Sequence, residues 1–387
     1  MTRSAAWSFI VVLSFALVAC KSGPKDAAPV AAGDGTAEGS QPISVAVGKP
    51  SGLLLEPADT FKLGYTIDWA TSVNLPSSGE LYSASVLGDL LVIVERPNNV
   101  VTAISMRDGK QLWRQQAGTF PYRAFAPARV DNTILVNTET QMFMFDASKE
   151  GKLISRANLD STVVTQPAMV GEIAVFGGAD GMIFGFDTRV GYAKWKFKMP
   201  GQMLVPAQAS GQQVFVAGID GQYALFAGRT GEVLWRGRVF DKVSAAPAVH
   251  SSGIYVPSQD HSLYALNRAT GEDRWIFRYT DDLVASPIVL QNTVYQPLPS
   301  GELVALKVTD GAELWRLKTT DKLVAQDARG LIFNGGDKVV QRDAGSGKMF
   351  DQIPVVGGKI AHLVQAEGQA LIVVSTTGRV LKLSQVK

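Results

Sequence analysis

Short apolar runs recur along this chain at a nearly constant interval, beginning near residue 65. Each run is rich in β-branched and aromatic residues, has the length of a strand, and is bounded by Gly, Asp or Asn. None shows the spacing of an amphipathic helix, so the pattern predicts β-strands. The eight runs are LLVIVE, TILVNT, IAVFGG, QVFVAG, GIYVPS, TVYQPL, LIFNGG and LIVVS.

A fixed order of elements follows each run. A turn such as Asp180-Gly181 comes first, and Asp-Gly is typical of tight β-hairpins. An alternating stretch such as SLYAL, a second turn such as ATGE, and a stretch containing tryptophan come next. Each unit of about 40 residues therefore predicts four antiparallel strands. Recurring prolines fit the innermost strand, a sheet edge that can lose an N–H; they are Pro127, Pro167, Pro206, Pro247 and Pro287.

Tryptophans mark the last strand of six units. The interval from the second to the third is 82 residues, which leaves room for a unit whose tryptophan is replaced. In that unit Gly151 remains, and Leu153 or Ile154 stands near the tryptophan position; in another, Gly347 remains with Met349 or Phe350. The six tryptophans are Trp69, Trp113, Trp195, Trp235, Trp275 and Trp315.

Six tryptophans and two replacements predict eight units. Four strands repeated about every 40 residues are typical of a β-propeller. We therefore expect an all-β fold, an eight-bladed propeller of four-stranded antiparallel blades over residues 61–387. The repeat starts and ends in mid-unit, so the N-terminal strand around Trp69 should pair with the C-terminal strands and close the ring.

A glycine precedes the tryptophan by four residues in five units, and we expect this pair of residue types to hold the blades together. An indole is large and flat and can cover the peptide surface that a glycine leaves bare. We expect each ring to dock near the turn glycine of a neighbouring blade. The residues are Gly109 and Trp113, Gly191 and Trp195, Gly231 and Trp235, Gly271 and Trp275, Gly311 and Trp315, together with Trp69.

The N-terminus predicts export and lipid attachment. Arg3 precedes an apolar run from Ala5 to Leu17, which is shorter than the roughly 20 residues of a membrane-spanning helix. The sequence Leu17-Val18-Ala19-Cys20 resembles the bacterial lipobox, in which the cysteine becomes the lipid-modified first residue. We expect residues 1–19 to be a lipoprotein signal peptide. Residues 20–60, rich in Ala, Gly and Pro, should form a lipidated cysteine and a flexible tether.

Composition gives little support to catalysis or nucleic-acid binding. The formal net charge is +2, and the basic residues do not cluster. The chain has one cysteine and three histidines, and it contains no HExxH, G-x-S-x-G or Walker-type motif. We therefore expect no enzymatic activity, no metal site and no cofactor.

Loops that differ between units are the candidate partner-binding surfaces. The segment AGTFPYRAFAP is the most distinctive, because aromatic residues and arginine are enriched at interaction hot spots. Its candidates are Phe120, Tyr122, Arg123 and Phe125. The alternative is that these aromatic side chains pack inward under the loop. Two further sets are Met199, Met203 and Leu204 in a second loop, and Gln166, Gln208, His250, Gln326 and Asp327, which could line the central channel.

The unit G-x-L-x-A-L-(x4)-G-x-x-x-W resembles the pyrroloquinoline-quinone-type propeller repeat, over residues 65–387. With the lipobox and tether, the chain resembles the BamB family of outer-membrane β-barrel assembly lipoproteins. That resemblance implies a non-enzymatic scaffold, anchored to the outer membrane by its lipid and facing the periplasm. It would be a monomer within a complex, with the barrel-insertion protein as its partner. The chain lacks an equivalent of the family's Leu-rich partner-binding segment with an arginine, so a sister lipoprotein with another partner stays open.

The alternative function is a pyrroloquinoline-quinone-family oxidoreductase or an exported propeller that binds a small ligand. The quinone enzymes are similar to this chain in the repeat alone. They have insertions that form the cofactor site and a disulfide between adjacent cysteines beside the cofactor. This chain has a near-uniform period and no cysteine pair.

Overall fold

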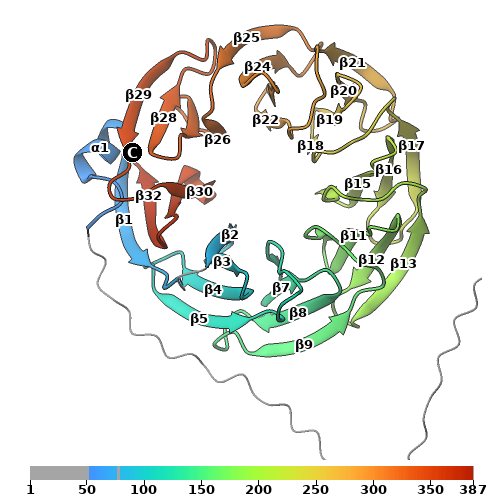
Figure 1. The fold of residues 1–387 in the computed structure, drawn as a ribbon, viewed down its shortest axis with the longest axis horizontal. Helices are drawn as coiled ribbons and strands as arrows, with labels where there is room; N and C mark the ends of the chain where they lie inside the picture. The colour runs from blue at the N-terminus through green and yellow to red at the C-terminus, as the bar shows by residue number, and fades with distance from the viewer. Residues whose placement is uncertain (1–51, 76–78, 387) are drawn as a thin grey trace, which may run out of the picture. The chain divides into compact units, whose positions relative to one another are not determined.

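Eight four-stranded antiparallel sheets follow one another round a ring (Figure 1). The computed structural model describes residues 52–75 and 79–386. The expected signal peptide, Cys20 and most of the expected tether lie outside these residues. Each sheet is one blade. Within a blade each strand pairs with the next one outward, from the innermost strand at the centre of the ring to the outermost strand at its rim. The predicted eight-bladed β-propeller is confirmed.

The first four blades occupy the N-terminal half of the ring. Blade 1 consists of β2 (Glu80–Leu87), β3 (Leu90–Arg96), β4 (Val100–Ser105) and β5 (Gln111–Gln116). Blade 2 consists of β6 (Ala128–Val130), β7 (Thr133–Asn137), β8 (Gln141–Asp146) and β9 (Leu153–Asn158). Blade 3 consists of β10 (Ala168–Val170), β11 (Ile173–Gly177), β12 (Met182–Asp187) and β13 (Tyr192–Lys198). Blade 4 consists of β14 (Gln208–Ser210), β15 (Gln213–Ala217), β16 (Gln222–Ala227) and β17 (Val233–Arg238).

The last four blades complete the ring, so that blade 8 lies next to blade 1. Blade 5 consists of β18 (Ala248–His250), β19 (Gly253–Ser258), β20 (Ser262–Leu266) and β21 (Asp273–Arg278). Blade 6 consists of β22 (Ile288–Leu290), β23 (Thr293–Pro297), β24 (Glu302–Lys307) and β25 (Glu313–Lys318). Blade 7 consists of β26 (Lys322–Gln326), β27 (Leu331–Asn334), β28 (Lys338–Arg342) and β29 (Met349–Pro354). Blade 8 consists of β30 (Ile360–Gln365), β31 (Leu371–Ser375), β32 (Arg379–Gln385) and β1 (Tyr65–Ser72). A 3₁₀ turn, η1 (Glu367–Gln369), precedes β31.

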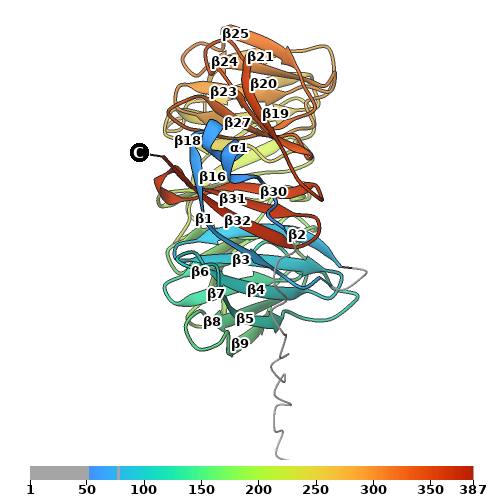
Figure 2. The same ribbon diagram turned by 90° about the vertical axis from the view of Figure 1, so that its left-hand side faces the viewer.

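Blade 8 closes the ring with strands from both ends of the chain. β1 is its outermost strand and pairs antiparallel with β32, from Tyr65 opposite Gln385 to Ser72 opposite Arg379. Figure 2 shows β1 beside β32. The predicted pairing of the N-terminal and C-terminal strands is therefore confirmed.

The eight apolar runs form the second strand of every blade, and they are buried almost throughout. Neighbouring blades cover both faces of these strands, so both sets of side chains face apolar surroundings. The outermost strands alternate instead; β13, for example, buries every second residue more deeply than its neighbours. A strand covered on both faces is therefore continuously apolar, whereas an outermost strand, exposed in part to solvent, alternates between more buried and more exposed residues.

An indole from one blade covers the turn glycine of the next blade at six of the eight joints. The Trp275 ring lies over Gly311, where an added Cβ would come within 2.6 Å of the ring, and its Nε1 donates to the Val308 carbonyl at 3.1 Å. The glycine of this turn has φ +73°, a conformation that favours glycine. The same arrangement joins Trp69 to Gly109, Trp113 to Gly151, Trp195 to Gly231, Trp235 to Gly271 and Trp315 to Gly347.

The contact therefore joins residues of different units. Gly271 receives Trp235 of the preceding blade, while Trp275 of its own unit reaches forward to Gly311. Gly191 departs from the pattern, because no heavy atom of the described residues would lie within 4 Å of a Cβ added there, its chain neighbours aside.

Two joints lack an indole, and the register identifies the residues that replace it. Each ladder tryptophan of blades 1 and 3–6 pairs with the third strand just before a β-bulge, as Trp113 does with Ala103. The residues in this place are Ser155 in blade 2, opposite Met144, and Asp351 in blade 7, opposite Gln341. The expected replacements, Leu153 or Ile154 and Met349 or Phe350, were wrong because they lie two or three residues after the glycine, whereas the tryptophan position lies four residues after it. The four-residue spacing from the glycine holds in both blades.

The N-terminal segment fills the joint between blades 7 and 8. It contains α1 (Pro57–Lys62), which begins with a proline at its first position. Leu54 and Leu55 are 1% and 0% exposed and pack with Ile353 of β29 and Leu383 of β32. The folded unit therefore begins before residue 61, inside the segment expected to be a flexible tether. The run Leu53-Leu54-Leu55 was the signal in the sequence for this packing.

Buried polar contacts fix the same joint. The Tyr65 hydroxyl donates to the Asp327 carboxylate at 2.9 Å, and both residues are buried. Burial and then the negative charge of Asp327 raise the pKa of Tyr65 well above its ordinary value, so the phenol keeps its proton. Gln341 donates to the Leu63 carbonyl at 3.0 Å. Asp327 therefore belongs to this joint and not to the channel lining for which it was a candidate.

Replacing Trp275 by alanine should weaken the joint between blades 5 and 6. The change removes a buried ring and its hydrogen bond, so we expect the free energy of unfolding to fall by about 3–5 kcal/mol. Urea unfolding followed by circular dichroism measures this loss. Leu234→Ala, at a position 42% exposed on β17, is the control and should change stability by less than about 0.5 kcal/mol. A Trp275→Ala curve superimposable on wild type would refute the docking role.

Leu55→Ala should destabilise the ring although Leu55 precedes the first strand. The deletion leaves a cavity in a cluster that spans blades 7 and 8, with an expected loss of about 2–5 kcal/mol. The melting temperature of Leu55→Ala, compared with that of Leu314→Ala, measures this loss. Leu314 is 41% exposed, so its replacement is the control. Equal melting temperatures for the two variants would show that the N-terminal segment contributes no stability to the ring.

Candidate protein-binding surface

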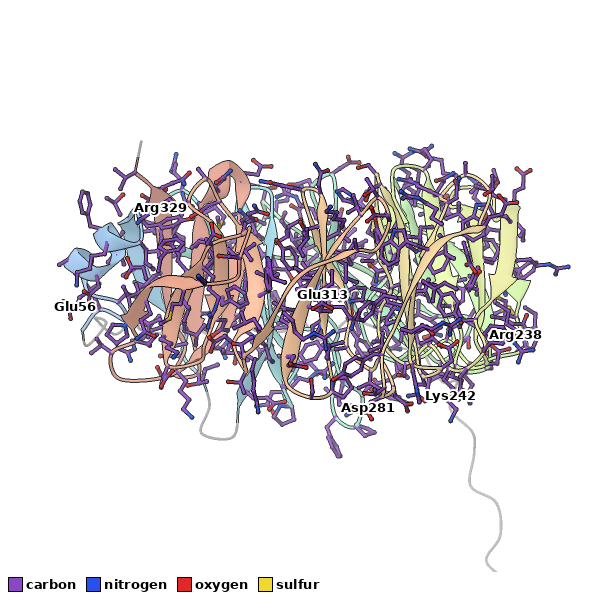
Figure 3. The ribbon with its side chains drawn as sticks, turned by 90° about the horizontal axis from the view of Figure 1, so that it is seen from above. Glu56, Arg238, Lys242, Asp281, Glu313 and Arg329 are labelled. Carbon is purple, nitrogen blue, oxygen red and sulfur yellow. The ribbon has the colours of Figure 1, made fainter. Side chains whose placement is uncertain are left out.

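One face of the ring gathers the connections between blades. These segments run from the outermost strand of one blade to the innermost strand of the next. Lys242 and Asp281, which belong to two of them, lie on the same face, while Arg329, in the turn between β26 and β27, lies on the opposite one (Figure 3). We call the first of these the connection face.

Large apolar side chains are exposed on six of these connections. The most exposed are Phe240 at 84% and Phe120 at 81%. Each of these connections exposes one or two such residues, and exposed apolar residues that lie singly are common on protein surfaces. The set consists of Phe120, Tyr122, Val164, Leu204, Phe240, Val284 and Val356.

The connection between β5 and β6 holds the four residues singled out in the sequence, and they point in different directions. Phe120 and Tyr122 are 81% and 47% exposed, whereas Phe125 is 7% exposed. The Phe125 ring packs edge-on against Tyr82, with centroids 6.5 Å apart. The structure thus combines both hypotheses: Phe125 packs under the loop, and Phe120 and Tyr122 face solvent.

Two side chains from blade 1 fix the backbone of this loop. Buried Asn99 donates through Nδ2 to the Tyr122 carbonyl at 2.6 Å and accepts the Ala124 N–H at 2.8 Å. Arg96 donates through Nε to the Ala124 carbonyl at 2.8 Å, and its guanidinium lies 3.2 Å from the centroid of the Tyr82 ring. Burial lowers the pKa of Arg96, while Tyr82 acts in the opposite direction. The exposed aromatics therefore stand on an ordered support.

Arg123 is held beside Glu139 in the neighbouring blade. Its backbone N–H donates to Glu139 at 2.7 Å, and its Nε lies 3.4 Å from the same carboxylate. The Arg123 side chain remains 68% exposed, so the guanidinium is available at the surface. Sequence reasoning found Arg123 but missed Asn99 and Arg96, because their role depends on hairpin geometry in another part of blade 1.

The other candidate sets are more dispersed. Met199 and Met203 are buried between blades, and Leu204 of the same loop is 42% exposed. His250 bonds to Ser252 at 2.8 Å within its own turn.

No helix among residues 52–75 and 79–386 is both long and apolar enough to cross a membrane. Over the same ranges no group of three or more His, Cys, Asp or Glu side chains is placed to hold a metal ion.

Solved structures share this architecture at low sequence identity. The crystal structure of BamB from Moraxella catarrhalis matches with a TM-score of 0.64 and 18% identity, covering 81% of this chain and 97% of that one. The computationally designed Ika8 protein matches with a TM-score of 0.66 at 14% identity, covering 82% and 99%. The C-terminal WD40 domain of Sif2 matches with a TM-score of 0.62 at 11% identity, with the same coverage. At such identities these matches establish the fold alone.

The family comparison uses the sequence itself. No curated protein matches the chain. The family model described as outer membrane protein assembly factor BamB matches residues 97–210 and 205–382, which together cover well over half of the 387 residues. The chain therefore belongs to the family described as outer membrane protein assembly factor BamB.

Proposed function

We propose that this chain is a lipid-anchored, non-enzymatic scaffold that faces the periplasm and takes part in inserting β-barrel proteins into the outer membrane. Membership of the BamB family supports the process, and the motif Leu17-Val18-Ala19-Cys20 supports the anchor. The observation that argues most directly for binding is the aromatic pair Phe120 and Tyr122, exposed on a loop that buried hydrogen bonds hold in place.

The scaffold acts by holding a partner in place. A ring closed by β1 and β32 is a rigid support, so its loops lose little conformational entropy on binding. Attachment at Cys20 confines the ring near the membrane and raises the effective concentration of the ring toward a membrane-bound partner. No group on the connection face has to move a proton or form a covalent bond for this role.

The partner that this function names is the barrel-insertion protein of the outer membrane. Phe120 and Tyr122 supply apolar area with few rotatable bonds, and Arg123 supplies a charged group on the same loop. Residues of these types dominate binding energy in protein interfaces. Loss of both aromatic side chains should therefore weaken the complex strongly while the ring stays folded.

Crosslinking followed by affinity capture from membranes tests the proposal. We expect the wild-type chain to recover the barrel-insertion protein and Phe120→Ala/Tyr122→Ala to recover about tenfold less, a loss of about 1.4 kcal/mol or more. Phe61→Ala is the matched control, since Phe61 on α1 is an aromatic residue 63% exposed outside the connections between blades. It should recover the partner as wild type does.

Two outcomes would contradict different parts of the proposal. Recovery of another protein in place of the barrel-insertion protein would refute the role in barrel assembly, but it would remain consistent with a protein-binding scaffold. Equal recovery by wild type and the double variant would remove the aromatic loop from the binding surface.

A further inference from the structure

Four methionines meet at the joint between blades 2 and 3. Met142 and Met144 of β8 belong to its apolar cluster from blade 2. Met169 of β10 and Met182 of β12 belong to it from blade 3. The chain has nine methionines, and no other apolar cluster of the described residues contains more than two. Thioether side chains therefore pack this joint to an extent that the other joints do not share.

The methionines lie at a joint without a docked indole. Trp195 of blade 3 stands opposite Gly185, and other ladder tryptophans stand opposite alanine or leucine. Blade 2 reverses the sizes, because Ser155 stands opposite Met144 and its hydroxyl bonds to the Met144 sulfur at 3.2 Å. The exchange puts a flexible side chain inside the joint. It leaves Gly191 uncovered, since a Cβ added there would meet no heavy atom of the described residues within 4 Å, its chain neighbours aside.

This joint depends on apolar packing more than its neighbours do. A methionine side chain is unbranched and has three rotatable bonds, so it fills irregular space without fixing one geometry. A docked indole adds a large flat contact and a hydrogen bond at six other joints. Between blades 2 and 3 the described residues make no such contact. The strength of the joint therefore depends on the methionine sulfurs remaining apolar.

Solvent reaches one of these methionines through a pocket. Met142 and Met144 are 0% and 3% exposed, whereas Met169 is only partly buried. Met169 lines a pocket of about 410 Å³, together with Asp131 in the turn between β6 and β7 and Glu172 in the turn between β10 and β11. These turns are the counterparts of the turn between β26 and β27, on the face opposite the connection face. Small solutes can therefore approach Met169 from that face.

The reaction available to an accessible thioether is oxidation by a peroxide. A lone pair of the sulfur attacks one oxygen of hydrogen peroxide, the S–O bond forms and the O–O bond breaks. The departing hydroxide takes the proton from the transferred oxygen and becomes water. The sulfur is oxidised by two electrons, and the peroxide is reduced. The product is a sulfoxide, which is polar and disrupts apolar packing.

We infer that Met169 is an oxidation site at which peroxides loosen the joint between blades 2 and 3. The sulfoxide puts a polar oxygen at the edge of the methionine cluster and weakens the packing of blade 2 on blade 3. Trp113 still joins blade 2 to blade 1 through Gly151, so the change is confined to one joint. The inference concerns the ring itself and does not depend on the function proposed above.

Graded treatment of the purified full chain with hydrogen peroxide tests the inference. Peptide mass spectrometry measures the sulfoxide fraction at each methionine. We expect Met169 to be oxidised at peroxide concentrations that leave Met142 and Met144 intact. The melting temperature should fall by at least about 2 °C as the Met169 sulfoxide accumulates. Hydrogen exchange of β9 should become at least about threefold faster over the same range.

Replacing Met169 by leucine removes the oxidisable sulfur and keeps the apolar volume. Met169→Leu should melt as wild type does without peroxide and should lose the fall caused by peroxide. Met349→Leu is the matched control, because Met349 is 48% exposed on β29 of blade 7. It should show the same fall as wild type. Met169→Gln introduces a polar side chain without any oxidant and should lower the melting temperature by itself.

The wild-type titration keeps the test decisive if Met169→Leu folds poorly, since it needs no substitution. Three results would overturn the inference. One is a Met169 that stays unoxidised while Met349 is fully converted to the sulfoxide. Another is oxidation of Met169 with no change in melting temperature or in β9 exchange. The third is protection from peroxide by Met182→Leu in place of Met169→Leu, which would assign the effect to Met182.

Discussion

The ring depends on one contact, made at six of its eight joints, in which an indole from one blade lies over a glycine of the next. The contact needs a residue without a side chain on one side and the largest apolar side chain on the other, and the indole N–H satisfies a carbonyl that the turn leaves free. Because the contact recurs, blades 1, 4, 5 and 6 are held by it on both faces, and blades 2, 3, 7 and 8 on one face. The blades are therefore mutually dependent, and the ring behaves as a rigid support for its loops.

The two joints without an indole differ in what takes its place. Between blades 7 and 8 the chain covers the surface with Leu54, Leu55 and α1, and it adds the buried pair of Tyr65 and Asp327. Between blades 2 and 3, Ser155 leaves the surface over Gly191 bare. The first joint is where the chain ends meet and closure must be stable. The second departs from the repeat with no such compensation, and departures from a repeated structural rule are where function is expected.

Much of this architecture could be predicted from periodicity. The spacing of the tryptophans and of the apolar runs leads to four strands per unit, eight units, and closure through Trp69, because each feature is local and repeated. The replacements for the missing indoles were misplaced because bulky residues were favoured over the four-residue spacing from the glycine, which leads to Ser155 and Asp351. Leu54 and Leu55 were assigned to the tether because they lie outside the period, although their burial depends on two blades far away in the sequence.

The candidate binding surface was less predictable than the fold. Composition identified the loop of Phe120, Tyr122, Arg123 and Phe125, but it could not separate the buried ring from the exposed ones. That separation depends on Asn99 and Arg96, which come from an earlier hairpin. The absence of an indole over Gly191, by contrast, follows from the sequence, because Ser155 stands four residues after Gly151.

Hydrogen exchange of the outermost strands tests the central claim that indole docking holds the blades together at six joints and is absent, without a replacement, between blades 2 and 3. Strands held by a docked tryptophan should open less often than a strand that lacks one. In native exchange followed by mass spectrometry, β9 of blade 2 should exchange faster than β17, β21 and β25, whose tryptophans are docked. Protection of β9 equal to that of these three strands would contradict the account.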